Sequence, residues 1–553
     1  MKSKNKFTLS GNIVDIRANS IYQGTVYVEN GTITNIVKED PLAGGTGVKE
    51  DQYILPGLID SHIHIESSML IPSEFAKLAV VHGTVATVSD PHEIANVLGI
   101  DGIKYMIANG SKVPFKFYFG ASACVPATPF ETSGFQFHEK EMEELLGMKE
   151  IKYLSEMMNF PGVINRDPWE MKKIGIAKKY NKPVDGHAPG VSGVDAKKYA
   201  EAGITTDHEC FTMHEALDKI AYGMKIQIRE GSAAQNFDSL IDLMKDHSDK
   251  VLFCSDDKHP NDLVKGHINQ LIIRAIKKGY EPLKVLRSAI LNPIEHYGLD
   301  VGTLQVNDPA DMIVVNNLED FTILQTYVNG IMVAENGKSY INSVPEDHPN
   351  NFHATIISAD KLRVSPKGDK LKVIEAYDGQ LITGFLSEAY KVENDNVVSD
   401  VESDILKIVV LNRYEKAEPA IGFIKNFNLK NGAIASSVAH DSHNIVAVGT
   451  SDKAITEAIN LIIKEGGGIS LVNGTDKKTL PLPVAGLMST CDGYRVAGSY
   501  QILDDEVHKM GSKLRAPYMT LSFMALLVIP ELKLSDKGLF DGIKFSFTEL
   551  FSS

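Results

Sequence analysis

The sequence predicts an α/β protein: a TIM-like (β/α)8 barrel with a split small β-sandwich domain and an additional C-terminal α+β domain. Three observations indicate this architecture. Apolar runs alternate with helical stretches between residues 54 and 298, as in parallel sheets with right-handed crossovers. Strand-rich segments flank that region on both sides. After residue 345 the alternation weakens, which indicates a further domain.

The composition fits a folded protein that acts on a small molecule. Hydrophobic residues make up 43% and charged residues 23% of the 553 residues, and a net charge of -15 argues against a nucleic-acid partner. No apolar segment reaches the ~18 residues of a membrane span, and no signal-peptide core follows the first lysines. Four cysteines without a C-x-x-C spacing indicate reduced thiols. We expect a cytoplasmic protein without a membrane partner.

The two flanking segments predict one split domain. Residues 7–40 alternate as short apolar strands around Asn30-Gly31, which is a strong hairpin signal. Residues 301–338 show the same alternation. We therefore assign residues 1–53 and 299–345 to the two parts of the β-sandwich and expect them to pair across the intervening region.

Residues 54–298 hold the predicted catalytic barrel. Eight strands in about 245 residues match the usual size of a (β/α)8 barrel. A doubly wound fold is the alternative, but no G-x-G-x-x-G follows a strand here and no G-x-x-x-x-G-K-[ST] occurs. The eight strand candidates are, in chain order, ILPGLIDSHIH, TVATVSD, FKFYFGAS, IKYLSEMM, KPVDGHA, GITTDHE, KIQIREGSA and KVLFCSDD.

Residues 346–553 are predicted to form the separate α+β domain. They contain strands such as DILKIVVLN and a helix, SDKAITEAINLIIKEG, that Ser451 or Asp452 would cap. The turn HDSHN in this domain carries His440, Asp441 and His443. It has two interpretations, a lid over the mouth of the barrel or an ordinary polar turn.

The stretch PGLIDSHIHIESS places two histidines at the end of an apolar strand. Because residues i and i+2 of a strand point to the same face, His62, His64 and Glu66 are expected on one side. A single histidine there is commonly a satisfied core residue. Two in alternation favour a metal site, since imidazole is the commonest protein ligand of divalent metals.

Four further candidate ligands stand at or near the ends of later strands: Glu156, His187, His208 and Asp256. Ordinary alternatives are a polar residue in a glycine-rich turn for His187, a salt bridge for His208 and a helix cap for Asp256. Glu156 is the most informative, because a lone carboxylate in an apolar strand is costly unless it is paired or binds metal. With about 30 residues per βα unit, the spacing places the ligands on strands 1, 4, 5, 6 and 8.

This order of residues resembles that of the amidohydrolase superfamily of metal-dependent hydrolases. It consists of an H-x-H on strand 1, a carboxylate on strand 4, single histidines on strands 5 and 6 and an aspartate on strand 8. Within that superfamily the sequence is similar to the adenine deaminase family, which also has a large C-terminal region. The similar stretches are PGLIDSHIHIESSML, TVSDPHEIANVLG, VDGHAPGVSG, TTDHE and FCSDDKHPNDL. The match covers the barrel and both β segments and extends into the C-terminal domain, where VAHDSHNIVAVG is also similar.

The resemblance implies a binuclear divalent metal site, with manganese or iron favoured and zinc compatible with the ligands. Many superfamily members bridge the metals with a carboxylated lysine on strand 4. Here Glu156 takes that place, because Lys152 lies four residues away, or ~13 Å along a strand. The resemblance further implies hydrolysis of adenine to hypoxanthine and ammonia, in purine salvage, by an enzyme that forms homo-oligomers, most simply dimers.

The expected mechanism begins with a water whose pKa the metals lower. Asp256 would act as general base and then as general acid. A second acid, to protonate the purine ring, is sought among Glu66, Glu209, Asp90 and Glu93. The stretch DPHE, with Asp90, His92 and Glu93, would bind the purine, orient a metal ligand or bind a further metal, while a helix N-cap by Asp90 with Pro91 in the first turn is the structural alternative.

Two other functions are compatible with such a barrel. A cyclic amide hydrolase of the hydantoinase or dihydroorotase type would use the same metals, so the ligands alone do not discriminate, and only the DPHEIAN stretch and the C-terminal domain favour the deaminase. A non-catalytic assembly protein on this barrel should lack several ligands. All six positions are filled in this sequence, which argues against it.

Overall fold

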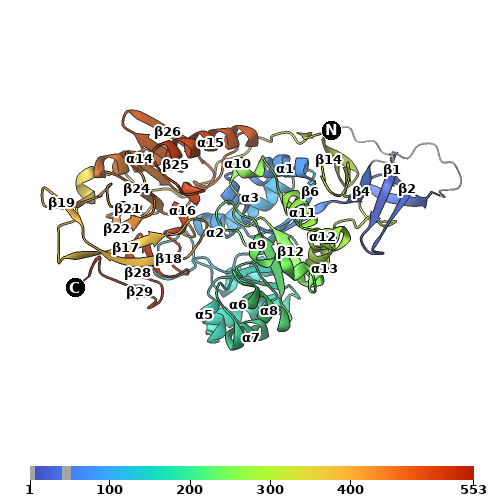
Figure 1. The fold of residues 1–553 in the computed structure, drawn as a ribbon, viewed down its shortest axis with the longest axis horizontal. Helices are drawn as coiled ribbons and strands as arrows, with labels where there is room; N and C mark the ends of the chain where they lie inside the picture. The colour runs from blue at the N-terminus through green and yellow to red at the C-terminus, as the bar shows by residue number, and fades with distance from the viewer. Residues whose placement is uncertain (1–5, 40–51, 553) are drawn as a thin grey trace.

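The computed structural model describes residues 6–39 and 52–552. The expectation about a signal peptide rests in part on the first lysines, of which Lys2 and Lys4 lie outside the described residues. Residues 40–51, near the end of the first predicted β segment, also lie outside them. Figure 1 shows three parts side by side along the long axis: a small β-sheet, a central barrel and the C-terminal domain, coloured from yellow to red. In the described part of the chain, no helix is long and apolar enough to cross a membrane.

The small sheet joins the two flanking segments of the sequence, which confirms that they pair across the barrel region. Its strand order is β16-β15-β14-β13-β4-β1-β2-β3. Strand β4 is the junction, because it pairs in parallel with β1 and antiparallel with β13. The strands are β1 (Lys6–Asp15), β2 (Ser20–Glu29), β3 (Thr32–Lys38), β4 (Tyr53–Pro56), β13 (Met312–Val315), β14 (Ile323–Val328), β15 (Ile331–Glu335) and β16 (Lys338–Ser339).

One predicted strand is in fact two. The run ILPGLIDSHIH divides at Gly57, so that β4 belongs to the small sheet and β5 begins the barrel. A Cβ atom on Gly57 would lie 2.3 Å from Cγ1 of Val85, and the Gly57 amide donates to the carbonyl of Asp311 at 3.1 Å. Glycine is therefore needed where the chain passes closely between the two domains.

Eight parallel strands form the barrel. They run in two hydrogen-bonded sets, β5 to β9 and β10 to β12. The amide of Thr205 donates to Val184 at 2.8 Å between the sets, and the amide of Asp256 donates to His62 at 3.0 Å where the last strand meets the first. The strands are β5 (Leu58–Ile63), β6 (Thr84–Ser89), β7 (Lys116–Ala121), β8 (Ile151–Met157), β9 (Val184–Gly186), β10 (Thr206–Asp207), β11 (Lys225–Arg229) and β12 (Val251–Cys254).

Helices connect these strands and surround them in Figure 1. The connections also contain four 3-10 turns, which are η1 (Ile65–Ser68), η2 (Val80–His82), η3 (Ile241–Met244) and η4 (Ser248–Lys250). The helices are α1 (Pro72–Ala79), α2 (His92–Leu98), α3 (Ile100–Gly110), α4 (Glu139–Gly147), α5 (Phe160–Ile164), α6 (Pro168–Lys179), α7 (Gly193–Ala202), α8 (Met213–Ala221), α9 (Phe237–Leu240), α10 (Pro260–Leu263), α11 (Ile268–Lys277), α12 (Pro282–Ala289) and α13 (Leu291–Tyr297).

The C-terminal domain is built on a mixed sheet of order β18-β17-β22-β21-β24-β23-β25-β26. Ser451 caps its helix α14, since the Ser451 hydroxyl accepts from the Ala454 amide at 3.2 Å. The larger elements are β17 (Lys370–Ala376), β18 (Thr383–Glu388), β21 (Leu406–Leu411), β22 (Ala420–Lys425), β23 (Ala433–Ser436), β24 (Ile445–Gly449), α14 (Asp452–Glu465), β25 (Gly468–Asn473), β26 (Asp476–Pro481), α15 (Gly493–Lys509), α16 (Pro517–Phe523), β27 (Leu532–Ser535), β28 (Gly538–Asp541) and β29 (Ser546–Phe547).

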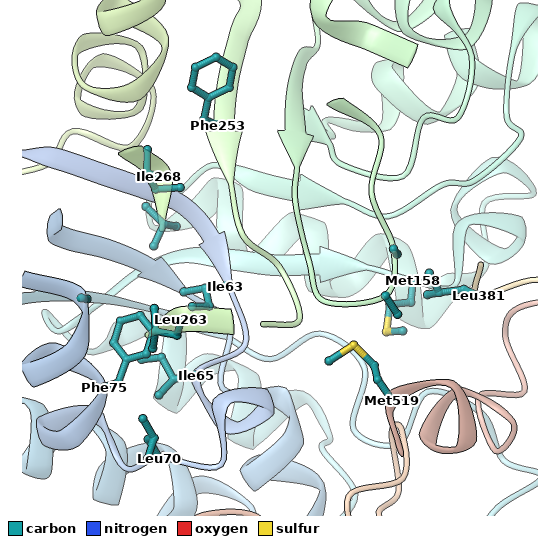
Figure 2. Close-up of a cluster of buried hydrophobic side chains, with 14 of the residues drawn as sticks. Ile63, Ile65, Leu70, Phe75, Met158, Phe253, Leu263, Ile268, Leu381 and Met519 are labelled. Atoms are coloured by element: carbon teal, nitrogen blue, oxygen red, sulfur yellow. The ribbon is translucent and has the colours of Figure 1, made fainter. Parts of the chain in front are cut away.

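The barrel and the C-terminal domain share one apolar core. Buried residues of both belong to a single cluster that includes Met158 after β8, Leu381 before β18 and Met519 on α16. Figure 2 shows these three side chains grouped at the junction of the two domains. The four cysteines are free, as expected, and three of them are buried. The shared core brings the C-terminal domain against the end of the barrel.

Candidate active site

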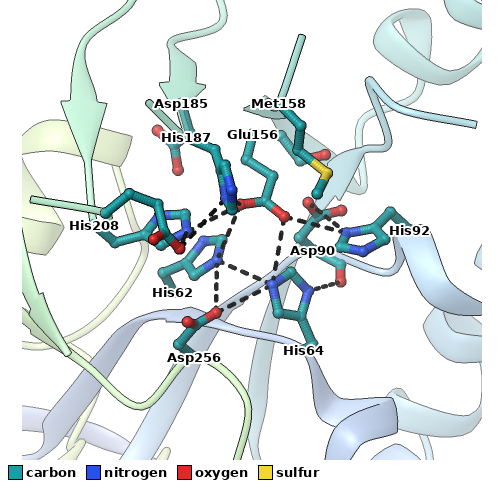
Figure 3. Close-up of polar contacts among 12 residues, drawn as sticks. His62, His64, Asp90, His92, Glu156, Met158, Asp185, His187, His208 and Asp256 are labelled. Atoms are coloured by element: carbon teal, nitrogen blue, oxygen red, sulfur yellow. Dashed lines mark hydrogen bonds and ion pairs between the residues drawn. The ribbon is translucent and has the colours of Figure 1, made fainter. Parts of the chain in front are cut away.

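The six predicted ligands meet at the carboxyl ends of the barrel strands (Figure 3). His62 lies in β5, Glu156 lies in β8, and the other four follow the ends of β5, β9, β10 and β12. All six are buried. Asp256 adopts a left-handed backbone conformation with φ 54°, an uncommon geometry for aspartate at the end of a strand. Side chains far apart in the sequence therefore converge because parallel strands end at one face of the barrel.

The ring nitrogens of the first two histidines lie unusually close together. His62 Nε2 and His64 Nε2 are 3.2 Å apart, and Asp256 Oδ1 lies 3.5 Å from the first and 3.3 Å from the second. Two buried imidazole nitrogens and a carboxylate oxygen that face one point form a set of electron-pair donors. This is the chemistry of a divalent metal site.

Glu156 lies between two groups of histidines. Its Oε2 is 2.9 Å from His187 Nδ1 and 3.0 Å from His208 Nε2, while its Oε1 is 3.5 Å from His64 Nε2. Burial alone would raise the pKa of Glu156, but His187 and His208 hold it well below the ordinary value. The group is therefore an anionic carboxylate that faces both sets of nitrogens.

Arg229 is a central residue of the site that the sequence analysis missed. It ends β11 and is buried. Its guanidinium donates to Asp256 Oδ2 at 2.6 Å and to Glu209 Oε2 at 2.8 Å, and it makes a second bond to Glu209 Oε1. Burial alone would raise the pKa of Asp256, but Arg229 together with His62 and His64 holds it well below the ordinary value. One feature of the sequence indicates such a role for Arg229, namely a charged residue at the end of the apolar run KIQIR.

Of two acids expected to face the substrate, Glu66 and Glu209, only the first is placed differently. The prediction that Glu66 shares the face of His62 and His64 is wrong, because β5 ends at Ile63 and the 3-10 turn η1 begins at Ile65. Glu66 instead accepts from the amide of Ile94 at 3.2 Å, and burial beside Glu93 raises its pKa to about 8. Glu209 borders the cavity, but both of its oxygens bind Arg229.

The stretch DPHE lies directly beside the ligands. His92 Nδ1 is 3.1 Å from Asp90 Oδ2 and 3.5 Å from Glu156 Oε1. The alternative in which Asp90 caps a helix is wrong, because Pro91 occupies the N-cap position of α2 and no side chain caps it. Ser67 Oγ donates to Glu93 Oε1 at 2.8 Å, so Glu93 is tied to the turn η1.

The turn between β23 and β24 reaches the barrel mouth. His440 and Asp441 border the same small cavity as His64, Glu156 and Asp256, together with Leu381, Phe523, Leu526 and Asp257. Asp441 Oδ1 lies 3.5 Å from His92 Nε2. Of the two interpretations of HDSHN, the structure therefore favours the lid. Asp257, which follows Asp256 in the sequence, was not singled out beforehand.

Comparison with known proteins agrees with this geometry. Residues 53–333 match the model described as "Amidohydrolase family", and residues 380–546 match "Adenine deaminase C-terminal domain". The adenine deaminase of Sulfurovum sp. (strain NBC37-1) is 55% identical over 542 residues, which cover 98% of this chain and 99% of that protein. The chain belongs to the adenine deaminase family of amidohydrolases.

Relatives from two further organisms are similar over nearly the whole chain. The adenine deaminase of Salinibacter ruber (strain DSM 13855 / M31) is 50% identical, with 99% of each chain covered. The adenine deaminase of Methanosarcina mazei (strain ATCC BAA-159 / DSM 3647 / Goe1 / Go1 / JCM 11833 / OCM 88) is also 50% identical, with 98% of this chain and 99% of that one covered. The family likeness thus extends over the barrel, the small sheet and the C-terminal domain, and it makes this chain a hydrolase with a divalent metal site.

Proposed function

We propose that this enzyme hydrolyses adenine at C6 to give hypoxanthine and ammonia. The observation that carries the proposal is the convergence of six buried histidine and carboxylate side chains, one of which, Asp256, is fixed by Arg229. Family membership supports the choice of substrate. A dimeric state, a cytoplasmic location and a role in purine salvage belong to the same proposal and rest on the family resemblance.

The donor set fits divalent metal ions. The residues that would hold them are His62, His64, Glu156, His187, His208 and Asp256, with Glu156 between the two groups of imidazoles. Mixed imidazole and carboxylate ligands accept manganese, iron or zinc, and the family resemblance favours the first two. When bound, the ions lower the pKa of a water molecule toward neutrality and so make a nucleophile available.

Asp256 has the geometry of the proton-transferring group. Arg229 holds its Oδ2 at 2.6 Å, whereas Oδ1 faces His62 and His64. As a carboxylate it accepts the proton of the attacking water, and it then delivers that proton toward the departing amine. The C6–O bond forms first, which makes C6 tetrahedral, and the C6–N bond then breaks as the protonated amine leaves, so that the products are hypoxanthine and ammonia.

Glu209 has the geometry of a positioning residue. Its two oxygens accept from the two terminal nitrogens of Arg229, one from each. Both oxygens of Glu209 are thus engaged with Arg229. We therefore assign Glu209 to the orientation of Arg229, and through it of Asp256, rather than to ring protonation.

The test is turnover of adenine beside turnover of a cyclic amide. Protein purified with manganese is supplied with adenine, and ammonia release and purine absorbance are followed. Dihydroorotate and hydantoin serve as competing substrates. Adenine turnover without cyclic amide turnover is the expected result. Opening of a cyclic amide by metal-loaded protein that leaves adenine unchanged would replace the deaminase with the alternative hydrolase.

A further inference from the structure

The C-terminal domain contributes polar side chains to a cavity whose other polar walls come from the barrel. The contributing turn lies between β23 and β24, and its His440 borders the cavity beside Asp257 and Asp441. The proposed mechanism assigns no task to this imidazole. It is nevertheless buried beside a cavity that residues of both domains line.

The nitrogens of His440 face carboxylates at distances longer than a direct hydrogen bond. Nδ1 lies 3.6 Å from Asp441 Oδ1 and 4.0 Å from Glu93 Oε1, and Nε2 lies 3.8 Å from Asp257 Oδ1. Buried donors normally have a partner, and gaps of this size are commonly filled by water or by a ligand atom. The imidazole is therefore available to a molecule in the cavity.

The position of the ring is fixed by packing. His440 stacks on Phe523 with centroids 5.0 Å apart and an angle of 26° between the planes. Three residues further on, His443 Nδ1 accepts from the Ala439 amide at 3.2 Å. The proton of neutral His443 is therefore on Nε2, which faces Glu93 Oε2 at 3.8 Å. Without a free electron pair on Nε2, His443 does not suit a metal site with Glu93, and it acts as a brace for the turn.

We propose that His440 is a substrate-contacting residue, supplied by the C-terminal domain, that donates a hydrogen bond to a ring nitrogen of the purine. This inference rests on the proposed function. It makes His440 a determinant of specificity, because a site that donates to a ring nitrogen rejects analogues that carry C–H there.

The walls around His440 combine apolar and polar side chains. Met158, Leu381, Phe523 and Leu526 supply apolar surface to the cavity, and His440 and Asp257 supply polar groups at its wall. Bases removed from a helix are recognised in this way, by apolar contact on the faces and hydrogen bonds at the edge. Burial alone would lower the pKa of His440, but Glu93 and Asp257 raise it to about 9, so both nitrogens carry a proton at neutral pH.

The test compares His440→Phe, which keeps an aromatic ring, with His440→Gln, which keeps an N–H donor. The matched control is His508→Phe, on α15 of the same domain, where Nδ1 lies 3.1 Å from the Ser512 carbonyl oxygen and the side chain does not border the cavity. Metal content, kcat and KM are measured with adenine, 3-deazaadenine and 7-deazaadenine, and hypoxanthine binding is measured by calorimetry.

We expect His440→Phe to raise KM for adenine and weaken hypoxanthine binding by about 10- to 100-fold, the range for a hydrogen bond to a charged group, at unchanged metal content. His440→Gln should recover part of this loss. Wild type should turn over at least one of the two deaza analogues less well than adenine. His440→Phe should turn over that analogue and adenine equally well.

The assignment of His440 would be overturned if the KM of His440→Phe for adenine stayed within about twofold of wild type. It would also be overturned if each His440 variant lost the same catalytic efficiency with adenine and with both analogues. Either result would leave the proposed deaminase function intact. Wild-type protein that neither turns over adenine nor binds hypoxanthine would overturn the proposed function, and the role of His440 with it.

Discussion

At the scale of single residues, the site depends on a buried charge network rather than on metal ligands alone. Arg229 binds Asp256 and Glu209 at once, and all three are buried. Removal of one partner from such a network leaves uncompensated charge in a medium that solvates it poorly. Substitutions of the arginine should therefore affect both stability and catalysis.

We predict that Arg229→Gln lowers the free energy of unfolding by about 3–5 kcal/mol and nearly abolishes adenine turnover. The physical reason is that Asp256 and Glu209 are then two buried carboxylates without their cation. Denaturant unfolding and steady-state kinetics measure the two effects. Arg274→Gln is the matched control, because Arg274 is 36% exposed in its pair with Glu230 and should cost at most about 1 kcal/mol. Equal costs for both variants would contradict the network.

Residue patterns indicated the six converging side chains better than the groups that surround them. The alternation in His62 and His64 follows from the period of a strand, and the carboxylate of Glu156 was conspicuous within an apolar run. Arg229, Asp257 and Asp441 could not be placed, because their roles depend on contacts across strands and domains. Glu66 was misplaced because the sequence did not reveal that η1 begins one residue after His64.

At the scale of elements, Gly57 separates two strands that the sequence presents as one. A methyl group there would lie 2.3 Å from Val85 Cγ1 on β6. Neither backbone can move freely, because β4 is paired with β1 and β13 while β5 is paired with β6. The short connection thus fixes the small sheet against the barrel.

We predict that Gly57→Ala destabilises the protein by about 1–3 kcal/mol, the usual cost of overpacking, and that Gly57→Ala/Val85→Ala recovers part of the loss. The matched control is Gly175→Ala on α6, where an added Cβ meets nothing within 4 Å and should stabilise the helix by up to about 1 kcal/mol. Thermal unfolding of the four proteins checks this. No recovery in the double variant would show that Val85 is not the obstacle.

A buried lysine links two elements beside the cavity. Lys533 on β27 donates to the carbonyl of Leu381 at 2.6 Å and to that of Phe523 at 3.0 Å. Burial lowers the pKa of Lys533 to about 7, whereas an unfolded chain has the ordinary value of about 10.4. Between these two pKa values the unfolded state binds more protons than the folded state. The destabilisation caused by burying the Lys533 side chain is therefore complete below pH ~7 and disappears toward pH ~10.

We therefore predict that the stability of wild type relative to Lys533→Met rises from pH ~7 to ~10, with a slope approaching 1.4 kcal/mol per pH unit. Urea unfolding of the two proteins across this range measures the difference. A difference independent of pH would mean that Lys533 stays charged throughout, held by its two carbonyl acceptors.

At the scale of the whole molecule, barrel and C-terminal domain form one unit. Many of their buried apolar residues belong to one shared cluster, and the cavity is lined from both sides. Length and local pattern predicted a separate C-terminal domain, but its position over the barrel mouth depends on long-range packing that no local pattern encodes. The fold class and the order of the domains could be predicted, because they rest on local alternation within each segment and not on long-range packing.

We predict that the two domains unfold together. Trp169 on α6 is the single tryptophan of the chain, so its fluorescence reports on the barrel. Far-ultraviolet circular dichroism reports on all three parts. Coincident urea transitions by the two probes are expected, because separation would expose the shared apolar core. A fluorescence transition that precedes or follows the dichroism change would show that the domains are energetically independent.

The most direct measurement is adenine turnover during reconstitution of metal-free protein with manganese, with metal content determined at each step. For wild type, activity is predicted to rise to its limit at about two ions per chain and to be absent without metal. Glu156→Gln, which lacks the carboxylate between the two groups of histidines, should bind fewer ions and remain inactive. Full turnover by metal-free wild type, or by Glu156→Gln, would contradict the account.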